Sequence, residues 1–400
     1  MARIWFYNIP YHGHVNPTLR LVRALVQGGD EVTYFSSPAF QERIEATGAV
    51  FRAYQNGQAF EASRNNTHII FLGSLVAQTT HAVLPEVLAD VGAEQPELIM
   101  FDMSAPWGAI ASRRFDIPTV ASFPHLPFTW RTIFDDARVF RKVTGSLLPG
   151  EGHWRSLLGG TTAIIRDYNL RNPRDFNVLS SSADLNLVFS SRYFQPYAET
   201  YDSSYLFIGP DIETERREEP LAITRQPGQR LLYIAVGTVY QASRQFFQDC
   251  FEAFSDPRFA VVLSVGRAVD PADLGEAPPN FTVAQYVPQL SVLQEADLFI
   301  THGGMNSINE AILYGVPLVV VPNTIEQTTN ALRIEQLHAG LYLDHQELTV
   351  EKLRDAVLQV LTDREVPTGL QRIQESFAAS GGVPRAVSAL QAFKSSRGIT

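Results

Sequence analysis

The chain has 400 residues, 45% hydrophobic and 18% charged, which exceeds the span of a single core and predicts two globular domains rather than a disordered or fibrous chain. A net charge of −10 argues against nucleic acids and anionic membranes as partners, and it means that an anionic ligand needs local donors. The single cysteine, Cys250, excludes an intramolecular disulfide and is typical of the reducing cytoplasm.

The first half of the sequence alternates short apolar runs with helical stretches. Pro10 and His12 break the N-terminal run, which indicates a first strand rather than a signal peptide, and no run reaches the roughly 18–20 apolar residues of a membrane span. A helix is predicted over Asn16–Gly28, with Pro17 in its first turn. The strands predicted in this half are Arg3–Ile9, Glu31–Ser36, Leu98–Asp102, Thr119–Ser122 and Leu185–Ser190.

The strands of the second half are apolar throughout, as expected when helices cover both faces of a parallel sheet. They are Leu231–Val236, Ala260–Val265, Phe281–Gln285, Leu298–Thr301, Leu318–Val321 and Gly340–Leu343. The predicted organisation is an N-terminal domain over 1–208, a charged, proline- and glycine-rich linker over 209–228, a C-terminal domain over 229–378, and a final helix over 379–400 that packs back on the first domain. Ligands of such domains bind at the carboxyl ends of the strands, so a cleft between the domains is the expected site.

The most informative segment is THGGMNSINE, residues 301–310. Its paired glycines form a tight turn between a buried strand and a helix, and they let a ligand approach the backbone closely. A helix start offers unpaired N–H groups and partial positive charge, which predicts an anion site. For the glycine turn alone, a plain strand-to-helix connection is an equal alternative, but the full 27-residue run to Gln327 favours the binding site.

A second candidate site follows the first strand, where His12 and His14 lie. A reaction that removes a proton from a hydroxyl group needs a base, and histidine suits that role near neutral pH. A carboxylate that orients the base is expected, and Asp102 ends another predicted strand. The residues alone leave open a structural histidine and a helix-capping role for Asp102. In an extended segment both histidines would point the same way, but His14 lies nearer the helix start and is the better anchored base.

These segments, together with IPYHGHVNPTL (9–19), VGTVY (236–240) and QYVPQLSVL (285–293), resemble the UDP-glycosyltransferase superfamily, in particular its bacterial macrolide-glycosyltransferase-like branch. The resemblance spans the whole chain, although 55–230 matches only in general character. It implies the α/β GT-B fold, two facing Rossmann-like domains with the active site in the interdomain cleft. It also implies inverting transfer of a sugar from a UDP-sugar to a hydroxyl of an apolar small molecule such as a macrolide or flavonoid. Glucose is the first candidate for the sugar. The chain departs from relatives at Tyr286, where plant members carry tryptophan, and at Asn323, where bacterial relatives often carry glutamine.

The resemblance also implies a role for each site residue. His14 is the base and Asp102 its partner. For the donor, Val287 and Gln289 border the nucleobase, Glu310 binds the ribose, Glu326 and Gln327 bind the sugar, and the diphosphate is held by Thr238, His302, Gly304, Asn306 and Ser307. The aromatic-rich region would line an acceptor pocket, with Phe71, Phe123, Phe128 and Trp130 as candidates, although each is equally compatible with a core position.

No metal or other cofactor is expected, because the sequence has no HExxH, paired CxxC or Asp-x-Asp motif. A dehydrogenase is disfavoured because no GxGxxG follows the first strand. The expected partners are a nucleotide sugar and an apolar acceptor, with the protein acting as a monomer or homodimer. The alternatives are a sugar-nucleotide epimerase on the same frame and an inactive binding protein, and UDP release that depends on an acceptor separates the transferase from both.

Overall fold

In the computed structural model the chain forms two compact units. The first comprises Met1–Asp211 and Ser376–Thr400, and the second comprises Ile212–Glu375. The structure describes residues 1–57, 69–146, 153–168, 180–212, 221, 223, 225–236, 244–266 and 269–399. Among these residues no helix is long and apolar enough to cross a membrane. The divisions lie close to the predicted domain ends at 208 and 378, and part of the predicted linker over 209–228 lies outside the described residues.

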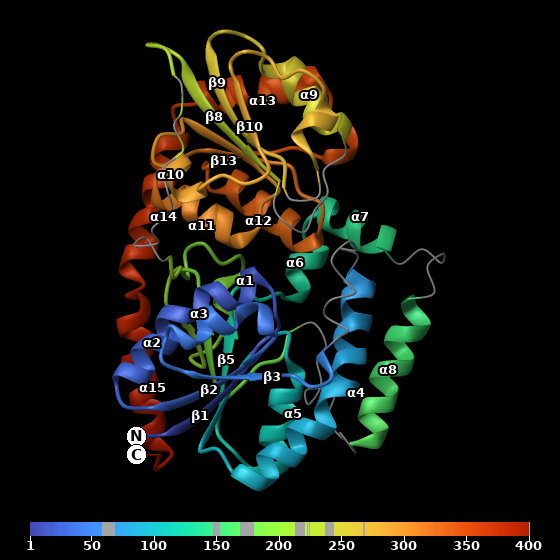
Figure 1. The fold of residues 1–400 in the computed structure, drawn as a ribbon, viewed down its shortest axis with the longest axis vertical. Helices are drawn as coiled ribbons and strands as arrows, with labels where there is room; N and C mark the ends of the chain where they lie inside the picture. The colour runs from blue at the N-terminus through green and yellow to red at the C-terminus, as the bar shows by residue number, and fades with distance from the viewer. Residues whose placement is uncertain are drawn as a thin grey trace. The chain divides into compact units, whose positions relative to one another are not determined.

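The first unit is built on a parallel sheet with the order β3-β2-β1-β4-β5-β6-β7 in the described part of the chain (Figure 1). Its strands are β1 (Arg3–Tyr7), β2 (Glu31–Ser36), β3 (Val50–Ala53), β4 (Leu98–Asp102), β5 (Thr119–Phe123), β6 (Leu185–Val188) and β7 (Tyr205–Phe207). Its helices are α1 (His12–Val15), α2 (Leu19–Gln27), α3 (Gln41–Glu45), α4 (Ile69–Glu94), α5 (Pro106–Phe115), α6 (Trp130–Phe134), α7 (Ala137–Ser146), α8 (His153–Asp167) and α15 (Gly382–Ser396).

Two strands of this sheet, β3 and β7, were not predicted from the sequence. They are the two edge strands, and both are short and only partly buried. An edge strand packs against one neighbour only, so it lacks the continuous apolar run by which β4 and β5, buried at every position, are recognised. Strand β1 is shorter than the predicted Arg3–Ile9, because it ends at Tyr7 and α1 begins at His12.

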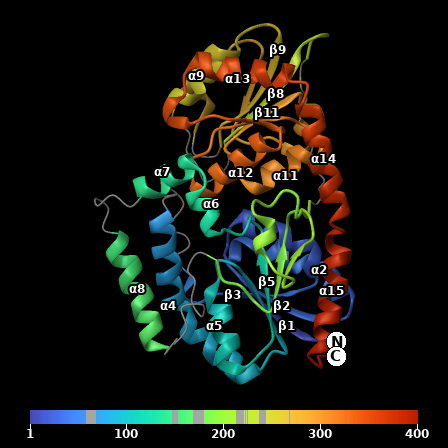
Figure 2. The same cartoon turned by 180° about the vertical axis from the view of Figure 1, so that it is seen from behind.

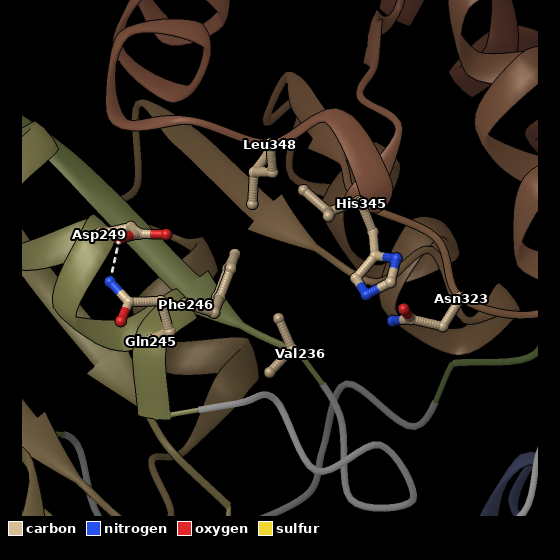
Figure 3. Close-up of a pocket in the computed structure, with 8 residues that line it drawn as sticks. Val236, Gln245, Phe246, Asp249, Asn323, His345 and Leu348 are labelled. Carbon is tan, nitrogen blue, oxygen red and sulfur yellow. Dashed lines mark hydrogen bonds between the residues drawn. The ribbon is translucent and has the colours of Figure 1, made fainter.

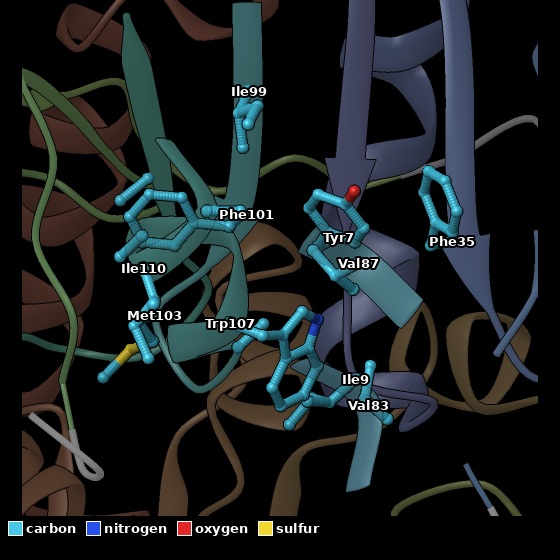
Figure 4. Packing of buried hydrophobic residues seen from close by; sticks show 14 of the residues in the cluster. Tyr7, Ile9, Phe35, Val83, Val87, Ile99, Phe101, Met103, Trp107 and Ile110 are labelled. Carbon is cyan, nitrogen blue, oxygen red and sulfur yellow. The ribbon is translucent and has the colours of Figure 1, made fainter. Parts of the chain in front are cut away.

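Aromatic and aliphatic side chains pack together in one core of the first unit (Figure 4). The Tyr7 and Phe35 rings stack at 4.5 Å between centroids, and the buried Trp107 donates its indole N–H to the Tyr54 hydroxyl at 3.2 Å. At Gly108 on α5 an added Cβ would lie 2.6 Å from Phe101 Cβ, so only glycine lets this helix approach β4 so closely. Helix α5 therefore packs tightly against β4 near the carboxyl end of that strand.

The C-terminal helix α15 belongs to the first unit, where it packs against α2. Ala386 and Leu390 are fully buried in a cluster with the apolar face of α2. Lys394 forms an ion pair with Asp30 at 2.6 Å, and both side chains are almost completely buried. The two chain termini consequently lie side by side (Figure 2).

The second unit is built on another parallel sheet, ordered β10-β9-β8-β11-β12-β13 among the described residues. Its strands are β8 (Arg230–Ala235), β9 (Phe259–Ser264), β10 (Phe281–Ala284), β11 (Leu298–Thr301), β12 (Leu318–Val320) and β13 (Gly340–Tyr342). Its helices are α9 (Arg244–Phe254), α10 (Gln289–Leu293), α11 (Met305–Leu313), α12 (Ile325–Gln336), α13 (Val350–Thr362) and α14 (Val366–Ala379), the last of which continues into the first unit.

Both sheets reverse their strand order at one place. In the first unit the reversal lies between β1 and β4, and in the second it lies between β8 and β11. At such a point the connecting helices leave in opposite directions, which opens a crevice beyond the carboxyl ends of the two strands. The predicted α/β class with two parallel-sheet domains is confirmed, and each domain has one topological position suited to a ligand.

Candidate functional sites

The reversal point of the first sheet carries His14 and Asp102. His14 lies in α1, the single helical turn after β1, and Asp102 is the last residue of β4. The His14 Nδ1 atom lies 2.9 Å from Asp102 Oδ2, and the carboxylate is fully buried. The other carboxylate oxygen, Oδ1, accepts the backbone N–H of Ser104 at 2.8 Å. Both oxygens therefore have donors, as a buried carboxylate requires, and the sequence-based pairing of these two residues is present in the structure.

A buried network holds the backbone of His14. Asn8 donates its side-chain amide to the His14 carbonyl at 3.1 Å and to the Tyr34 hydroxyl at 2.6 Å. The Tyr34 hydroxyl lies 2.9 Å from the hydroxyl of Thr18, at the start of α2. Asn8 was missed by the sequence analysis, which placed it inside the predicted strand Arg3–Ile9, whereas β1 ends at Tyr7. The network ties the base to β1, β2 and α2, which fixes its position before any ligand binds.

The structure separates His12 from His14 in a way that the sequence analysis did not foresee. The expectation that both lie in an extended segment and point the same way is wrong, because His12–Val15 is a helical turn. Residues two apart on a helix lie about 200° apart around its axis. Accordingly His14 is buried against Asp102, whereas His12 is exposed and its ring contacts Phe40 at 4.9 Å between centroids.

A further histidine, His125, contacts the predicted base. Its Nε2 atom lies 2.8 Å from the Nε2 atom of His14. His125 follows β5, and β5 pairs with β4 so that Ser122 lies opposite Asp102. The sequence analysis did not select His125, although His125, like His14, lies shortly after a predicted strand.

The four aromatic residues predicted to line an acceptor pocket have different surroundings. Phe71 on α4 and Phe128 after β5 are half-buried. Phe123 has no exposed surface, and its ring packs against Tyr205 within the core. Trp130 begins α6, and its side chain lies outside the described part of the structure. Phe123 is thus a core residue here, and an acceptor contact by the other residues stays a prediction.

The reversal point of the second sheet carries the glycine turn between β11 and α11. Gly303 has a φ of 86°, and an added Cβ would lie 2.5 Å from Val320 Cγ1, so only glycine fits. Gly304 is the N-cap residue of α11, and within the described structure no side chain caps this helix. The first N–H groups of α11 thus have no side-chain acceptor, which suits a bound anion. Asn306 and Ser307, predicted to hold the diphosphate, lie in this first turn and are half-buried.

His302 lies against the glycine turn and is electrically neutral near pH 7. An added Cβ on Gly304 would lie 2.6 Å from His302 Nε2, so the ring covers that backbone. Burial lowers the pKa of His302 to about 4, although the carboxylate of Glu326 acts in the opposite direction. A neutral imidazole offers an anion one N–H donor rather than a positive charge.

Gln289 joins two of the predicted donor-binding residues. Its side-chain amide donates to a carboxylate oxygen of Glu310 and lies 3.4 Å from the Ser307 hydroxyl. Its amide oxygen accepts the Tyr233 hydroxyl at 3.1 Å. The Glu310 carboxylate therefore has a fixed orientation about one helical turn beyond the glycine turn. Val287, predicted to contact the base through its backbone, is buried just before α10.

Glu326 and Gln327 lie in the first turn of α12, and other residues of the protein hold their side chains. The Gln327 amide oxygen accepts the backbone N–H groups of Asn323 and Thr324, at 2.9 and 3.2 Å. The buried Asn330 donates to the Gly303 carbonyl and to Glu326 Oε1, at 3.0 and 3.1 Å. Asn330 thus connects the glycine turn to the predicted sugar-binding carboxylate. It was missed by the sequence analysis, although its position one turn after Glu326 places it on the same helix face.

A pocket of about 210 Å³ opens at the carboxyl edge of the same sheet (Figure 3). Asn323 and His345 lie on one side of it, and the hydrogen-bonded pair Gln245 and Asp249 lies on the other. Val236, which follows β8, forms part of its wall. The pocket is smaller than the roughly 300–1,000 Å³ of usual small-molecule sites, so it would hold only a part of a nucleotide sugar. Thr238, predicted to reach the diphosphate, lies outside the described residues.

Comparison with known proteins shows which family the whole chain resembles. A family described as erythromycin biosynthesis protein CIII-like, C-terminal domain, matches residues 259–392. The chain is 34% identical over 409 residues to the NDP-glycosyltransferase YjiC of Bacillus licheniformis, covering 99% of this chain and 98% of the relative. It is 29% identical over 403 residues to the oleandomycin glycosyltransferase of Streptomyces antibioticus, covering 98% of this chain and 90% of the relative.

Solved structures give the same result. The kitacinnamycin glycotransferase matches with a TM-score of 0.83 and 28% identity, over 98% of this chain and 99% of that one. The calicheamicin glycosyltransferase CalG4 matches with a TM-score of 0.81 and 27% identity, over 99% and 98%. The fold and the named relatives therefore define a glycosyltransferase of the GT-B fold, which disfavours the epimerase alternative. The chain belongs to the family of bacterial NDP-glycosyltransferases that includes YjiC, and the predicted superfamily branch is confirmed.

Proposed function

We propose that the protein transfers a sugar from a UDP-sugar to a hydroxyl of an apolar natural product by an inverting displacement. Glucose is the first candidate for the sugar. The observation that carries this proposal is the hydrogen bond between His14 and the buried Asp102 at a sheet reversal point. Relatives named for oleandomycin, calicheamicin and kitacinnamycin support a natural product as the acceptor. The name of YjiC leaves the nucleotide of its donor open, so UDP is the more specific part of the proposal.

In the proposed step His14 acts as the general base. Its Nε2 atom takes the proton of the acceptor hydroxyl while the acceptor oxygen forms a bond to the anomeric carbon. The bond from that carbon to the diphosphate breaks on the opposite face, and UDP leaves with the bonding pair. The imidazolium formed on His14 is stabilised by the carboxylate of Asp102, which is already in place and already desolvated.

The leaving diphosphate gains negative charge as the bond breaks. The uncapped start of α11 and the neutral donor His302 are the groups proposed to stabilise that charge. Among the described residues no group of three histidine, cysteine or acidic side chains is placed to hold a metal ion. We propose a metal-independent reaction, with the helix start and His302 as the local donors, in which turnover persists in EDTA and needs no added Mg²⁺ or Mn²⁺.

The test is incubation of the protein with UDP-glucose and a panel of macrolides and flavonoids, with the products read by mass spectrometry. The expected result is an acceptor whose mass rises by one hexose, together with UDP release that depends on the acceptor. TDP-glucose in a parallel series tests the choice of nucleotide. Conversion of UDP-glucose to another UDP-hexose without an acceptor would instead indicate the epimerase.

A further inference from the structure

The contact between His125 and His14 occupies the atom that the reaction needs. The two Nε2 atoms lie 2.8 Å apart, and the rings meet edge to face with their centroids 4.5 Å apart. His14 is nearly buried, whereas His125 is half-buried. The nitrogen of His14 that faces away from Asp102 therefore takes part in a hydrogen bond with His125.

The direction of that hydrogen bond follows from the partners of Asp102. An ionised carboxylate only accepts hydrogen bonds, so His14 carries its proton on Nδ1 and donates it to Asp102. The Nε2 atom of neutral His14 is then a lone pair. Two lone pairs do not face each other at 2.8 Å, so the network assigns the proton between the rings to His125 Nε2. His125 donates, and the base of the reaction accepts.

A proton relay through His125 does not fit its burial. A relay would need the Nδ1 atom of His125 to take the proton of the acceptor, but that atom is buried. The Nε2 atom is the one that meets His14, and it already carries a proton. His125 therefore acts on the base and not on the substrate.

We propose that His125 is a positioning residue that covers the base until an acceptor displaces it, so that the enzyme transfers its sugar rather than hydrolysing its donor. This inference rests on the proposed function of His14. Water competes with the acceptor for the same lone pair. In hydrolysis the water proton would pass to His14 Nε2, the water oxygen would bond to the anomeric carbon, and UDP would leave. A bound acceptor gains enough contacts to displace His125, whereas a single water molecule does not.

The experiment compares His125→Ala with His125→Gln, which keeps an N–H donor on a side chain of similar reach. UDP release from UDP-glucose is measured without acceptor and with saturating acceptor. Loss of one hydrogen bond to the base predicts acceptor-free UDP release about tenfold faster in His125→Ala, and a smaller change in kcat for transfer at saturating acceptor. His125→Gln should stay near the wild type, and the double variant His14→Ala/His125→Ala should lose the added hydrolysis.

Equal acceptor-free hydrolysis in His125→Ala and the wild type, with both folded by thermal melting, would overturn the proposal. A rise that persists in the double variant would also overturn it, because the added hydrolysis would then not pass through His14. Failure of the proposed function gives a different result, namely that His14→Ala alone leaves transfer intact. Nitrogen-15 chemical shifts supply a readout that needs no turnover: without ligands we expect His14 protonated at Nδ1 and His125 at Nε2, and the reverse tautomer on His14 would contradict the assignment.

Discussion

The two units have their candidate sites at the same topological position, but one site consists of side chains and the other mainly of backbone groups. At the reversal point of the first sheet the chemistry lies in side chains, joined from Asp102 through His14 to His125. At the reversal point of the second sheet the central element is backbone, a glycine turn and an uncapped helix start, and the polar side chains around it bind one another. A proton transfer needs one basic atom at a defined position. A diphosphate has many oxygens, so several hydrogen-bond donors can bind it together. Single substitutions in each site test this contrast between side-chain and backbone chemistry.

The largest effect is expected for His14→Ala. Turnover should fall by roughly 10² to 10⁴, the usual contribution of a general base. Donor affinity, measured by calorimetry with UDP, should hardly change, since none of the predicted donor-binding residues belongs to the first unit. His12→Ala is the matched control, because His12 lies in the same helical turn but is exposed. If His12→Ala is the inactive variant, the base has been assigned to the wrong histidine.

Asp102→Asn should cost less than His14→Ala. The amide still accepts the Ser104 N–H, but it leaves the imidazolium without a negative partner. A hydrogen bond to a charged group predicts a loss in kcat of about 10- to 100-fold. Steady-state kinetics over a range of acceptor concentrations measure this loss. An effect on KM alone would show that Asp102 serves binding rather than the proton transfer.

Glu310→Ala tests the side chains around the backbone turn. Loss of the ribose contact should weaken UDP binding about tenfold, while pyrophosphate binding stays unchanged. Asp355→Ala is a suitable control, because it removes an exposed carboxylate from α13 of the same unit. Isothermal calorimetry with both ligands gives the two affinities. Equal UDP affinity in Glu310→Ala and the wild type would remove Glu310 from the site.

The smallest effect is expected for His302→Gln. With a pKa near 4 the imidazole of the free protein is neutral above about pH 5, so glutamine supplies an equivalent neutral N–H donor. UDP-glucose affinity should be similar in His302→Gln and the wild type, lower in His302→Ala, and flat in the wild type from pH 5.5 to 8. Wild-type affinity that rises as the pH falls through 6 would show instead that a charged imidazolium binds the diphosphate.

The sequence was sufficient for the fold class and for the strands at the centre of each sheet, because these buried parallel strands are mostly apolar. It was insufficient for β3 and β7, whose exposed sides break that pattern. Within the sites, His14 and Asp102 were selected from a resemblance, and their hydrogen bond required the pairing of β1 with β4. His125 and Asn330 were not selected, because no spacing along the chain relates residue 125 to residue 14 or residue 330 to residue 303. Tertiary structure alone brings them together.

The ion pair between Asp30 and Lys394 has a consequence for the order in which the protein folds during synthesis. In the sequence, the second unit is one continuous segment between the two segments of the first unit. All of its strands therefore leave the ribosome before α15 does. Until then Asp30 lacks the cation that accompanies its burial, and the apolar face of α2 lacks its cover. Domains of a growing chain usually fold from the N-terminus onward. Here the unit that is begun first is completed last.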